Sequence, residues 1–183
     1  MVMKKPTKED LRQAYGKPIA DTLATNLKVI FCGINPGLYT AAMGYAYSHP
    51  GNRFWPTLYA AGFTPRLLAP VEQHLLLALG YGLTNLVPRA TASEKEWSKE
   101  ELVRDGEVLL QKLKIYQPDW VAFVGVGAYR KAFDRPEAEV GMQHEKFGET
   151  RIWLLPSPSG LNAHYAGEKM IREFRKLREL FSA

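Results

Sequence analysis

Four short apolar runs stand out along the chain, and the segments between them mix apolar and polar residues in a helical pattern. The runs are continuously apolar, which is typical of parallel strands that are covered on both faces. The strands that they predict span 28–34, 82–87, 120–126 and 151–155. Strands that alternate with helices favour a parallel α/β sheet.

Helical periodicity is clearest in two segments. Ser98 and Glu101 have the spacing of a capping box, and apolar residues then recur at helical intervals until Pro118. A second apolar stripe runs from Met170 to Phe181, with Lys and Arg on its other side. Weaker patterns predict helices over 8–15, 54–61, 70–79 and 128–133. We therefore expect a three-layer α/β/α sandwich around a central, mostly parallel, four-stranded sheet.

The length of 183 residues suits one domain with a sizeable core and is too short for two. We assign 28–183 to a single domain and 1–27 to a basic N-terminal extension that is partly helical. No window approaches about 18 consecutive apolar residues, and the charged N-terminus lacks the apolar centre of a signal peptide. These patterns predict a cytoplasmic protein of a bacterium or archaeon, neither secreted nor bound to a membrane.

The residue types that hold cofactors are sparse. The single cysteine, Cys32, excludes an internal disulfide and a cysteine-held iron–sulfur cluster, and the four histidines lack metal-ligand spacing. The glycines of VGVGAYR do not complete a dinucleotide fingerprint, and the sequence contains neither a phosphate-binding P-loop nor a Gly-x-Ser-x-Gly elbow. We expect no metal and no organic cofactor.

The net charge of +5 is modest, but the carboxylates are unevenly distributed. None occurs between Asp21 and Glu72, and none occurs from Thr150 to Gly167. A surface that approaches phosphates excludes carboxylates, because like charges repel. Buried strands and turns also contain few acids. Charge alone leaves both interpretations open.

Two loops at the ends of predicted strands have unusual compositions. In GINPG, Asn35 precedes a proline, and Pro36-Gly37 is a strong turn signal that leaves neighbouring amide hydrogens free to point outward. In PSPSGLNAHY, residues 156–165, Leu161 stands in a polar loop, where it is well placed to wedge between stacked bases. The alternative, that Leu161 packs against the last helix, is the more common fate of a lone loop leucine.

Four motifs, GINPG, HPGNRFW, GLTNLV and PSPSGL, occur in this order along the chain. Together they resemble the mismatch-specific uracil-DNA glycosylases and the related thymine-DNA glycosylases, from about Lys28 to the C-terminus. Such enzymes flip a nucleotide out of duplex DNA, because a stacked base hides its C1′ carbon, and hydrolyse the N-glycosidic bond. The resemblance implies a monomeric enzyme that acts on double-stranded DNA without a cofactor. It would remove uracil, preferentially from G·U mismatches, and leave an abasic site.

The resemblance also implies roles in the pocket. Asn35 matches the residue that positions the attacking water, and since an amide is not a general base, its role would be orientation. Backbone N–H groups around Gly37 and Leu38 would stabilise the departing uracil anion. Tyr47 would stack on the flipped pyrimidine, and Asn85 would hydrogen-bond its edge. The other substrate-binding residues that it implies are Ile34 and Thr40.

A second group of residues is implied to bind DNA. Leu161 would fill the gap left by the flipped nucleotide, and Gly160 would let the loop backbone come close to the duplex. Ser157 and Ser159 would bind flanking phosphates, and Arg53 is a further candidate for a phosphate contact. The DNA-binding residues that the resemblance implies are Arg53, Ser157, Ser159, Gly160, Leu161 and Asn162.

The sequence departs from the family in two places. Ser157 stands where many uracil glycosylases have His or Asn, and the GINPG motif lacks the carboxylate of the most active uracil-specific enzymes. Glu94 and Glu96 follow the second predicted strand closely, and we hypothesise that one of them assists the attacking water. The alternative is that both are solvated residues ahead of a helix.

Two other classes of function remain open. A glycosylase-like domain could bind mismatched or damaged DNA with little or no cleavage, although Asn35 argues against this. A small nucleotide-binding hydrolase is disfavoured by the missing phosphate loops. No lysine stands out as a lyase nucleophile, so we expect the abasic strand to stay intact.

Overall fold

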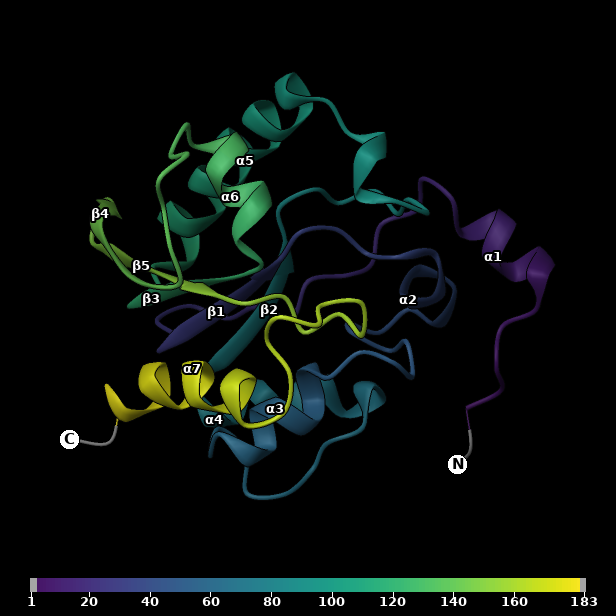
Figure 1. Cartoon of the computed structure of the whole chain (residues 1–183), viewed down its shortest axis with the longest axis horizontal. Coiled ribbons are helices and arrows are strands. Elements are labelled where there is room, and N and C mark those ends of the chain that lie inside the picture. The colour runs from purple at the N-terminus through teal and green to yellow at the C-terminus, as the bar shows by residue number, and fades with distance from the viewer. Residues whose placement is uncertain (1–2, 182–183) are drawn as a thin grey trace.

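The protein, described here by a computed structural model for residues 3–181, is built on one five-stranded sheet in the order β2-β1-β3-β5-β4 (Figure 1). The strands are β1 Val29–Gly33, β2 Tyr81–Asn85, β3 Trp120–Val124, β4 Gly141–Phe147 and β5 Thr150–Leu155. The pairs β1 with β2, β1 with β3 and β3 with β5 are parallel. This confirms the mostly parallel α/β sheet.

The predicted strand count of four is wrong, because β4 adds a fifth strand at the sheet edge. β4 pairs antiparallel with β5, and its side chains alternate between half-buried and exposed. Met142 is 60% exposed on this strand. An edge strand with one solvent-exposed face has no continuous apolar run, and such a run is what predicts the other four strands.

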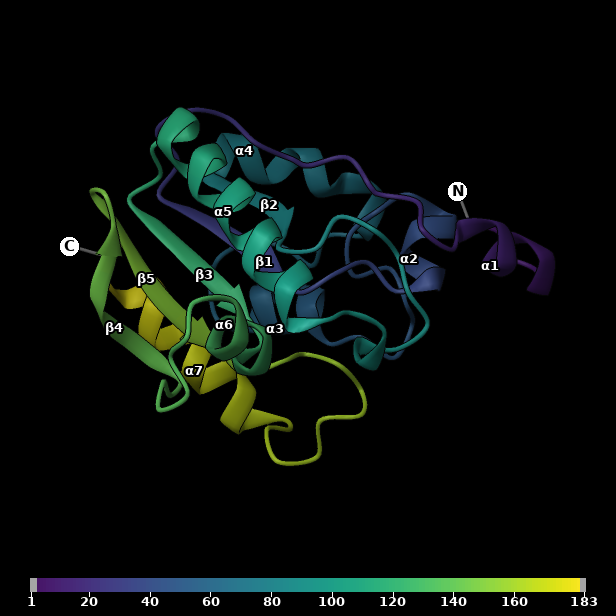
Figure 2. The ribbon, with the colours of Figure 1, turned by 90° about the horizontal axis from the view of Figure 1, so that it is seen from above.

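Helices cover both faces of the sheet, as predicted. They are α1 Lys8–Ala14, α2 Leu38–Met43, α3 Phe54–Ala60, α4 Leu76–Leu79, α5 Lys99–Tyr116, α6 Val126–Ala132 and α7 Glu168–Glu179. Two short 3₁₀ helices, η1 Pro70–Leu75 and η2 Glu94–Glu96, precede α4 and α5. The helix predicted over 70–79 is therefore split into η1 and α4. α5 and α6 lie on one face, and α3, α4 and α7 lie on the other (Figures 1 and 2).

β1 shows how one strand serves both layers. Val29 and Phe31 belong to the core shared with α3, α4 and α7, whereas Ile30 and Cys32 belong to the core shared with α5 and α6. All four side chains are at most 1% exposed. A strand buried on both faces must be continuously apolar, which is why the sequence revealed it so clearly.

Only half of the predicted capping box at α5 forms. Ser98 Oγ accepts a hydrogen bond from the Glu101 backbone N–H (3.1 Å). The Glu101 carboxylate does not reach back to Ser98 but pairs with Arg89. This arrangement ties the start of α5 to the segment that follows β2.

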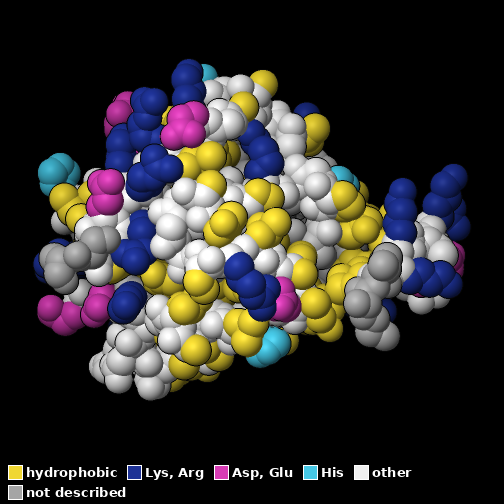
Figure 3. Space-filling view, turned by 90° about the horizontal axis from the view of Figure 1, so that it is seen from below, with side chains coloured by type: hydrophobic (Ala, Val, Ile, Leu, Met, Phe, Trp, Pro, Cys, Tyr) yellow, Lys and Arg dark blue, Asp and Glu magenta, His cyan; other side chains and the backbone are white. Residues whose placement is uncertain are grey.

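The segment after α1 adds a short antiparallel bridge beside β2. Thr22 and Leu83 exchange two backbone hydrogen bonds (2.8 and 2.9 Å), and Asp21 accepts from Lys112 Nζ (2.6 Å) and Thr84 Oγ1 (2.7 Å). α1 lies beside α2 and projects from the body, with several exposed Lys and Arg side chains (Figures 1 and 3). No helix among residues 3–181 is long and apolar enough to cross a membrane.

Candidate active-site cleft

The carboxyl ends of the parallel strands meet at one edge of the sheet, where a cleft of about 960 Å³ opens. Residues from the segments 34–40, 91–95 and 157–162, which follow β1, β2 and β5, line it. Residues 19–21, parts of 46–52, the strand residues 83–85 and Val124 complete the lining. Parallel sheets usually bind ligands at this edge. The two loops that the sequence singled out therefore share one cleft.

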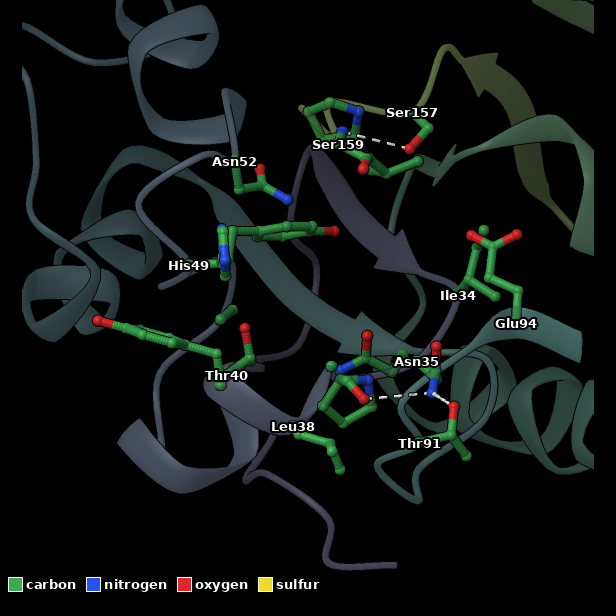
Figure 4. Close-up of a pocket in the computed structure, with 18 of the residues that line it drawn as sticks. Ile34, Asn35, Leu38, Thr40, His49, Asn52, Thr91, Glu94, Ser157 and Ser159 are labelled. Carbon is green, nitrogen blue, oxygen red and sulfur yellow. Dashed lines mark hydrogen bonds between the residues drawn. The ribbon is translucent and has the colours of Figure 1, made fainter. Parts of the chain in front are cut away.

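The side chain of Asn35 is held by three acceptors at one end. Its Nδ2 donates to Thr91 Oγ1 (2.8 Å) and to the backbone carbonyls of Pro36 (3.2 Å) and Arg89 (3.3 Å). Thr91 Oγ1 donates its own proton to the Ser93 carbonyl (3.0 Å), so toward Asn35 it can only accept. The opposite end of the amide, Oδ1, points away from Thr91 into the cleft (Figure 4). It is placed to accept a hydrogen bond from a water or a ligand.

Arg89 is held in turn by α5. Its Nη2 donates to Glu101 Oε2 (2.9 Å) and to the backbone carbonyl of Glu96 (3.1 Å). The hydrogen bonds from Arg89 hold the pKa of the Glu101 carboxyl below its ordinary range. Since the Arg89 carbonyl accepts from Asn35, this ion pair supports the orientation of the Asn35 amide from behind.

Helix α2 begins directly after the GINPG turn. Gly37 is its N-cap and offers no side-chain acceptor, so the first N–H groups of the helix, including that of Leu38, have no intrahelical partner. An isolated parallel bridge joins Gly37 to Thr91. Thr40, one turn into the helix, is 8% exposed and lines the same wall of the cleft (Figure 4). This wall combines amide donors with a small side chain.

Tyr47 adopts a backbone conformation that is uncommon for an aromatic residue, with φ of +54°. Its ring stacks on Phe54 at 3.9 Å between centroids and 18° between planes, and it also lines the cleft. Its hydroxyl is buried without a hydrogen-bond partner among the described residues, and burial raises the pKa of the phenol far above its ordinary range. A Cβ at Gly33 would lie 2.9 Å from this hydroxyl and 2.7 Å from Asn85 Oδ1. Gly33, Tyr47 and Asn85 thus meet closely at the floor of the cleft.

Residues 156–165, which we call the Leu161 loop, form the opposite side. Leu161 is 95% exposed, so it does not pack against α7 as the alternative interpretation required. Ser157 Oγ accepts from the Ser159 amide, and Ser159 Oγ accepts from the Leu161 amide, each at 3.3 Å. Both hydroxyl protons stay available for another acceptor. Gly160 lies so close to the Gly51 carbonyl that a Cβ there would be 2.8 Å from its oxygen.

The side chains of Arg53 and Asn162, two residues expected to bind DNA, form hydrogen bonds within the protein instead. The Arg53 guanidinium donates to three backbone carbonyls of the Leu161 loop, which leaves it turned toward protein rather than solvent. The Asn162 amide donates to the Ser157 carbonyl (2.9 Å) and accepts from the Tyr165 amide (3.3 Å). Both side chains hold the loop that carries Leu161.

The two candidate acids, Glu94 and Glu96, have different surroundings in the structure. Both oxygens of the Glu96 carboxylate have donors, the Ser93 amide (2.9 Å) and the Tyr15 hydroxyl (2.8 Å), and Glu96 does not line the cleft. Glu94 does line it, as does Ile34 (Figure 4). Of the two acids, only Glu94 is placed where it could approach a bound substrate.

Sequence reasoning missed Thr91 and Arg89, which hold Asn35, and Asp21, which lines the cleft. Thr91 lies 56 positions from Asn35 in an irregular segment, where no periodic pattern marks it. The only available signal was its place soon after a predicted strand. Among residues 3–181, no group of His, Cys, Asp or Glu side chains is arranged to hold a metal ion.

Comparisons with known proteins agree with this fold. Residues 20–181 match the family model of the uracil DNA glycosylase superfamily. The chain is also similar to a solution NMR structure from Methanosarcina acetivorans, a protein provisionally assigned as a uracil DNA glycosylase. That likeness has a TM-score of 0.58 at 18% identity and covers 89% of this chain and 98% of the other, which supports the shared fold. The family model spans nearly the whole chain, including the cleft segments that follow β1, β2 and β5, and the protein therefore belongs to the uracil DNA glycosylase superfamily.

Proposed function

We propose that the protein is a monofunctional DNA glycosylase that acts as a monomer on duplex DNA and removes uracil, preferentially from G·U mismatches. The observation that carries this proposal is the fixed amide of Asn35, whose Oδ1 faces a cleft shared with the exposed Leu161. A residue that orients water and a residue that can replace an extruded base are both needed for hydrolysis of a flipped nucleotide.

Extrusion comes first. The target nucleotide leaves the helix, and Leu161 enters the space that it vacates. Flipping costs a few kcal/mol and costs less at a mismatch than at a Watson–Crick pair. A G·U wobble is therefore a better substrate than A·U. Ser157 and Ser159, whose hydroxyl oxygens accept backbone N–H groups within the loop, donate their hydroxyl protons to the phosphates on either side.

The flipped uracil then enters the cleft. Tyr47 offers it an aromatic face backed by Phe54, and such stacking contributes about 1–3 kcal/mol per base. The Asn85 amide hydrogen-bonds the edge of the base, and Ile34 contacts it from the end of β1. Thr40 limits the space at the pyrimidine 5-position.

The bond between C1′ and N1 breaks heterolytically, with positive charge developing on the sugar and negative charge on uracil. Backbone N–H groups of Gly37 and Leu38 stabilise the uracil anion. Asn35 Oδ1 accepts a hydrogen bond from water and directs the water oxygen at C1′. The water supplies a hydroxyl to the sugar, and its other proton goes to the solvent or to the uracil anion. The products are free uracil and an abasic site.

The first test is single-turnover excision from end-labelled duplexes that carry G·U, A·U or G·T, and from single-stranded uracil. We expect G·U to be cut well above A·U, and we expect Asn35→Ala to lose cleavage while it still binds the duplex. Tight binding of G·U without cleavage by the native protein would favour a DNA-binding domain of low activity. If the Asn35→Ala variant still cuts every one of these substrates rapidly, another residue positions the attacking water.

A second test concerns lyase activity. Of the described residues that line the cleft, Lys95 alone carries an amine. A monofunctional enzyme leaves the abasic strand intact until alkali or heat is applied. A borohydride-trapped adduct that disappears in Lys95→Ala would contradict this part of the proposal.

A further inference from the structure

We propose that Arg53 is a positioning residue that holds the Leu161 loop in the conformation needed to wedge into DNA, without contacting DNA itself. This inference rests on the proposed glycosylase function and adds a residue on which base extrusion depends. Arg53 is the N-cap of α3, more than 100 positions before the loop in the chain.

The guanidinium of Arg53 reaches three carbonyl oxygens of the loop. Nη1 donates to Tyr165 (2.8 Å), and Nη2 donates to Ser159 (2.7 Å) and Asn162 (2.9 Å). These acceptors bracket Leu161 on both sides. A planar guanidinium with several fixed N–H groups can satisfy such a set, whereas a lysine ammonium is a compact charge without that fixed fork.

Backbone contacts reinforce the same attachment. The Arg53 amide donates to the Pro158 carbonyl (2.9 Å), and the Gly51 carbonyl lies against Gly160. The turn that carries Gly51 and Arg53 is thus fitted to the Leu161 loop along its length. Gly160 has no side chain to prevent this approach.

The loop has little else to hold its tip. No helix or strand is formed from 156 to 165, and Leu161 itself is 95% exposed, so it buries almost no apolar surface. The order of the tip must therefore come from hydrogen bonds, among which those of Arg53 are assisted by its charge. Asn162 adds a second brace by donating to the Ser157 carbonyl (2.9 Å).

A direct phosphate contact by Arg53 fits the geometry poorly. Three of its N–H groups are used by carbonyls, and its Nε is buried. Only one Nη1 N–H is left, so Arg53 could not bind a phosphate with two parallel hydrogen bonds unless its guanidinium released the loop. Its effect on excision is therefore expected to pass through Leu161, because a loop that samples many conformations presents the wedge only part of the time.

The first arm of the test is amide hydrogen exchange of the full chain without DNA. In Arg53→Met, we expect the protected amides of Ser159, Leu161, Asn162 and Tyr165 to exchange at least about tenfold faster, while amides of β3 are unchanged. Arg53→Lys keeps the charge and guards against a variant that fails to fold, and we expect it to recover only part of the protection. Arg66→Met is the matched control, since Arg66 pairs with Glu72 away from the cleft.

The second arm is a double-mutant cycle on single-turnover excision from a G·U duplex. Arg53→Met and Leu161→Ala should each lower the rate about tenfold or more, and the double variant should be no slower than the slower single variant. Rate losses that multiply would overturn the inference. So would unchanged exchange in the loop, or an Arg53→Lys variant with native activity, since a phosphate contact tolerates lysine.

The two proposals fail in different ways. If the native protein leaves every uracil duplex intact, the glycosylase proposal fails, while the exchange arm still tests whether Arg53 orders the loop. If the native protein cuts G·U and the loop amides of Arg53→Met exchange at the native rate, only the role of Arg53 fails.

Discussion

The Asn35 amide nitrogen lies 2.8 Å from Thr91 Oγ1, and this contact decides which end of the amide faces the cleft. The Thr91 hydroxyl donates its only proton to the Ser93 carbonyl, so it can accept a hydrogen bond from Asn35 but cannot donate one. A reversed amide would place Oδ1 against three acceptors. The orientation that turns Oδ1 toward the cleft is thus fixed by acceptors from the segments that follow β1 and β2.

Removal of the Thr91 hydroxyl should therefore lower the rate of excision more than the affinity for DNA. We expect Thr91→Val to reduce the single-turnover rate on G·U duplex about fivefold, since a lost hydrogen bond that holds the amide costs about 1 kcal/mol. Thr91→Ser keeps the hydroxyl and serves as the control. Equal rates for the Val and Ser variants would show that the amide is held without Thr91.

The floor of the cleft gives a second prediction. In Gly33→Ala, the new methyl would meet Asn85 Oδ1 and the Tyr47 hydroxyl, and both are ends of side chains that can move. The displaced groups are those proposed to hold uracil, so we expect excision to fall at least tenfold, with a stability loss of about 1 kcal/mol. Single-turnover rates and urea unfolding measure the two effects separately.

Gly127→Ala is the matched control for this change. Gly127 lies in α6 and has nothing within 4 Å of the new methyl. An alanine there should leave excision unchanged and stabilise the helix by about 0.5–1 kcal/mol. Native activity in Gly33→Ala would show that Asn85 and Tyr47 do not set the shape of the pocket.

Most of the fold follows from one property of the sequence, which is burial on both faces. Ile30 and Phe31 point to opposite layers and are both fully buried, so the strand that holds them is apolar at every position. The sequence does not predict β4, because exposed residues such as Met142 interrupt the apolar pattern of this strand. Whether a strand lies at the edge of a sheet depends on which strands pair with it. The hydrophobic pattern of a single segment does not indicate that pairing.

The site was predictable only where chemistry is local. Asn35 and Leu161 stand in loops whose composition is unusual by itself, and the structure places both at one cleft. The family resemblance makes Arg53 a candidate for a phosphate contact, yet its partners in the structure are carbonyls more than 100 positions away. Contacts between distant loops determine whether a cation is available, and composition does not reveal them.

The ion pair behind Asn35 predicts a dependence of stability on pH. The pKa of Glu101 is lowered in the folded protein by the hydrogen bond from Arg89, so its stabilising effect is complete above the unfolded value of about 4.3. The effect is lost as the pH falls through the lower, folded pKa. Glu101→Gln should therefore cost up to about 1 kcal/mol at pH 7, or about 2–4 °C in Tm.

Thermal unfolding of both proteins from pH 7 to pH 3 measures this prediction. The difference in Tm should shrink below pH 4 as the native carboxylate takes up its proton. Glu100→Gln, in the same first turn of α5, is the control. A Tm difference that is the same at every pH would mean that packing, rather than the charge of Glu101, explains the loss.

Leu161→Ala should separate stability from function. The side chain is 95% exposed, so its truncation should change the free energy of unfolding by less than about 0.5 kcal/mol. Excision from duplex should fall at least tenfold, because nothing then fills the space of the extruded nucleotide. Stopped-flow fluorescence of 2-aminopurine beside the target reports extrusion directly, and an unchanged signal would assign the wedge to another residue.

Glu94 and Glu96 provide the last prediction, because the structure gives them different surroundings. Glu96 has a donor for each carboxylate oxygen, whereas Glu94 lines the cleft. If Glu94 assists the water, Glu94→Gln should lower the single-turnover rate about tenfold, although loss of a negative charge beside DNA should tighten binding. Glu96→Ala should keep the native rate and lose about 1 kcal/mol of stability through its cap at Ser93.

Rates on G·U duplex and affinities for an abasic duplex distinguish these outcomes. A Glu94→Gln variant that binds more tightly and cuts at the native rate or faster would identify Glu94 as a solvated residue that only repels phosphate.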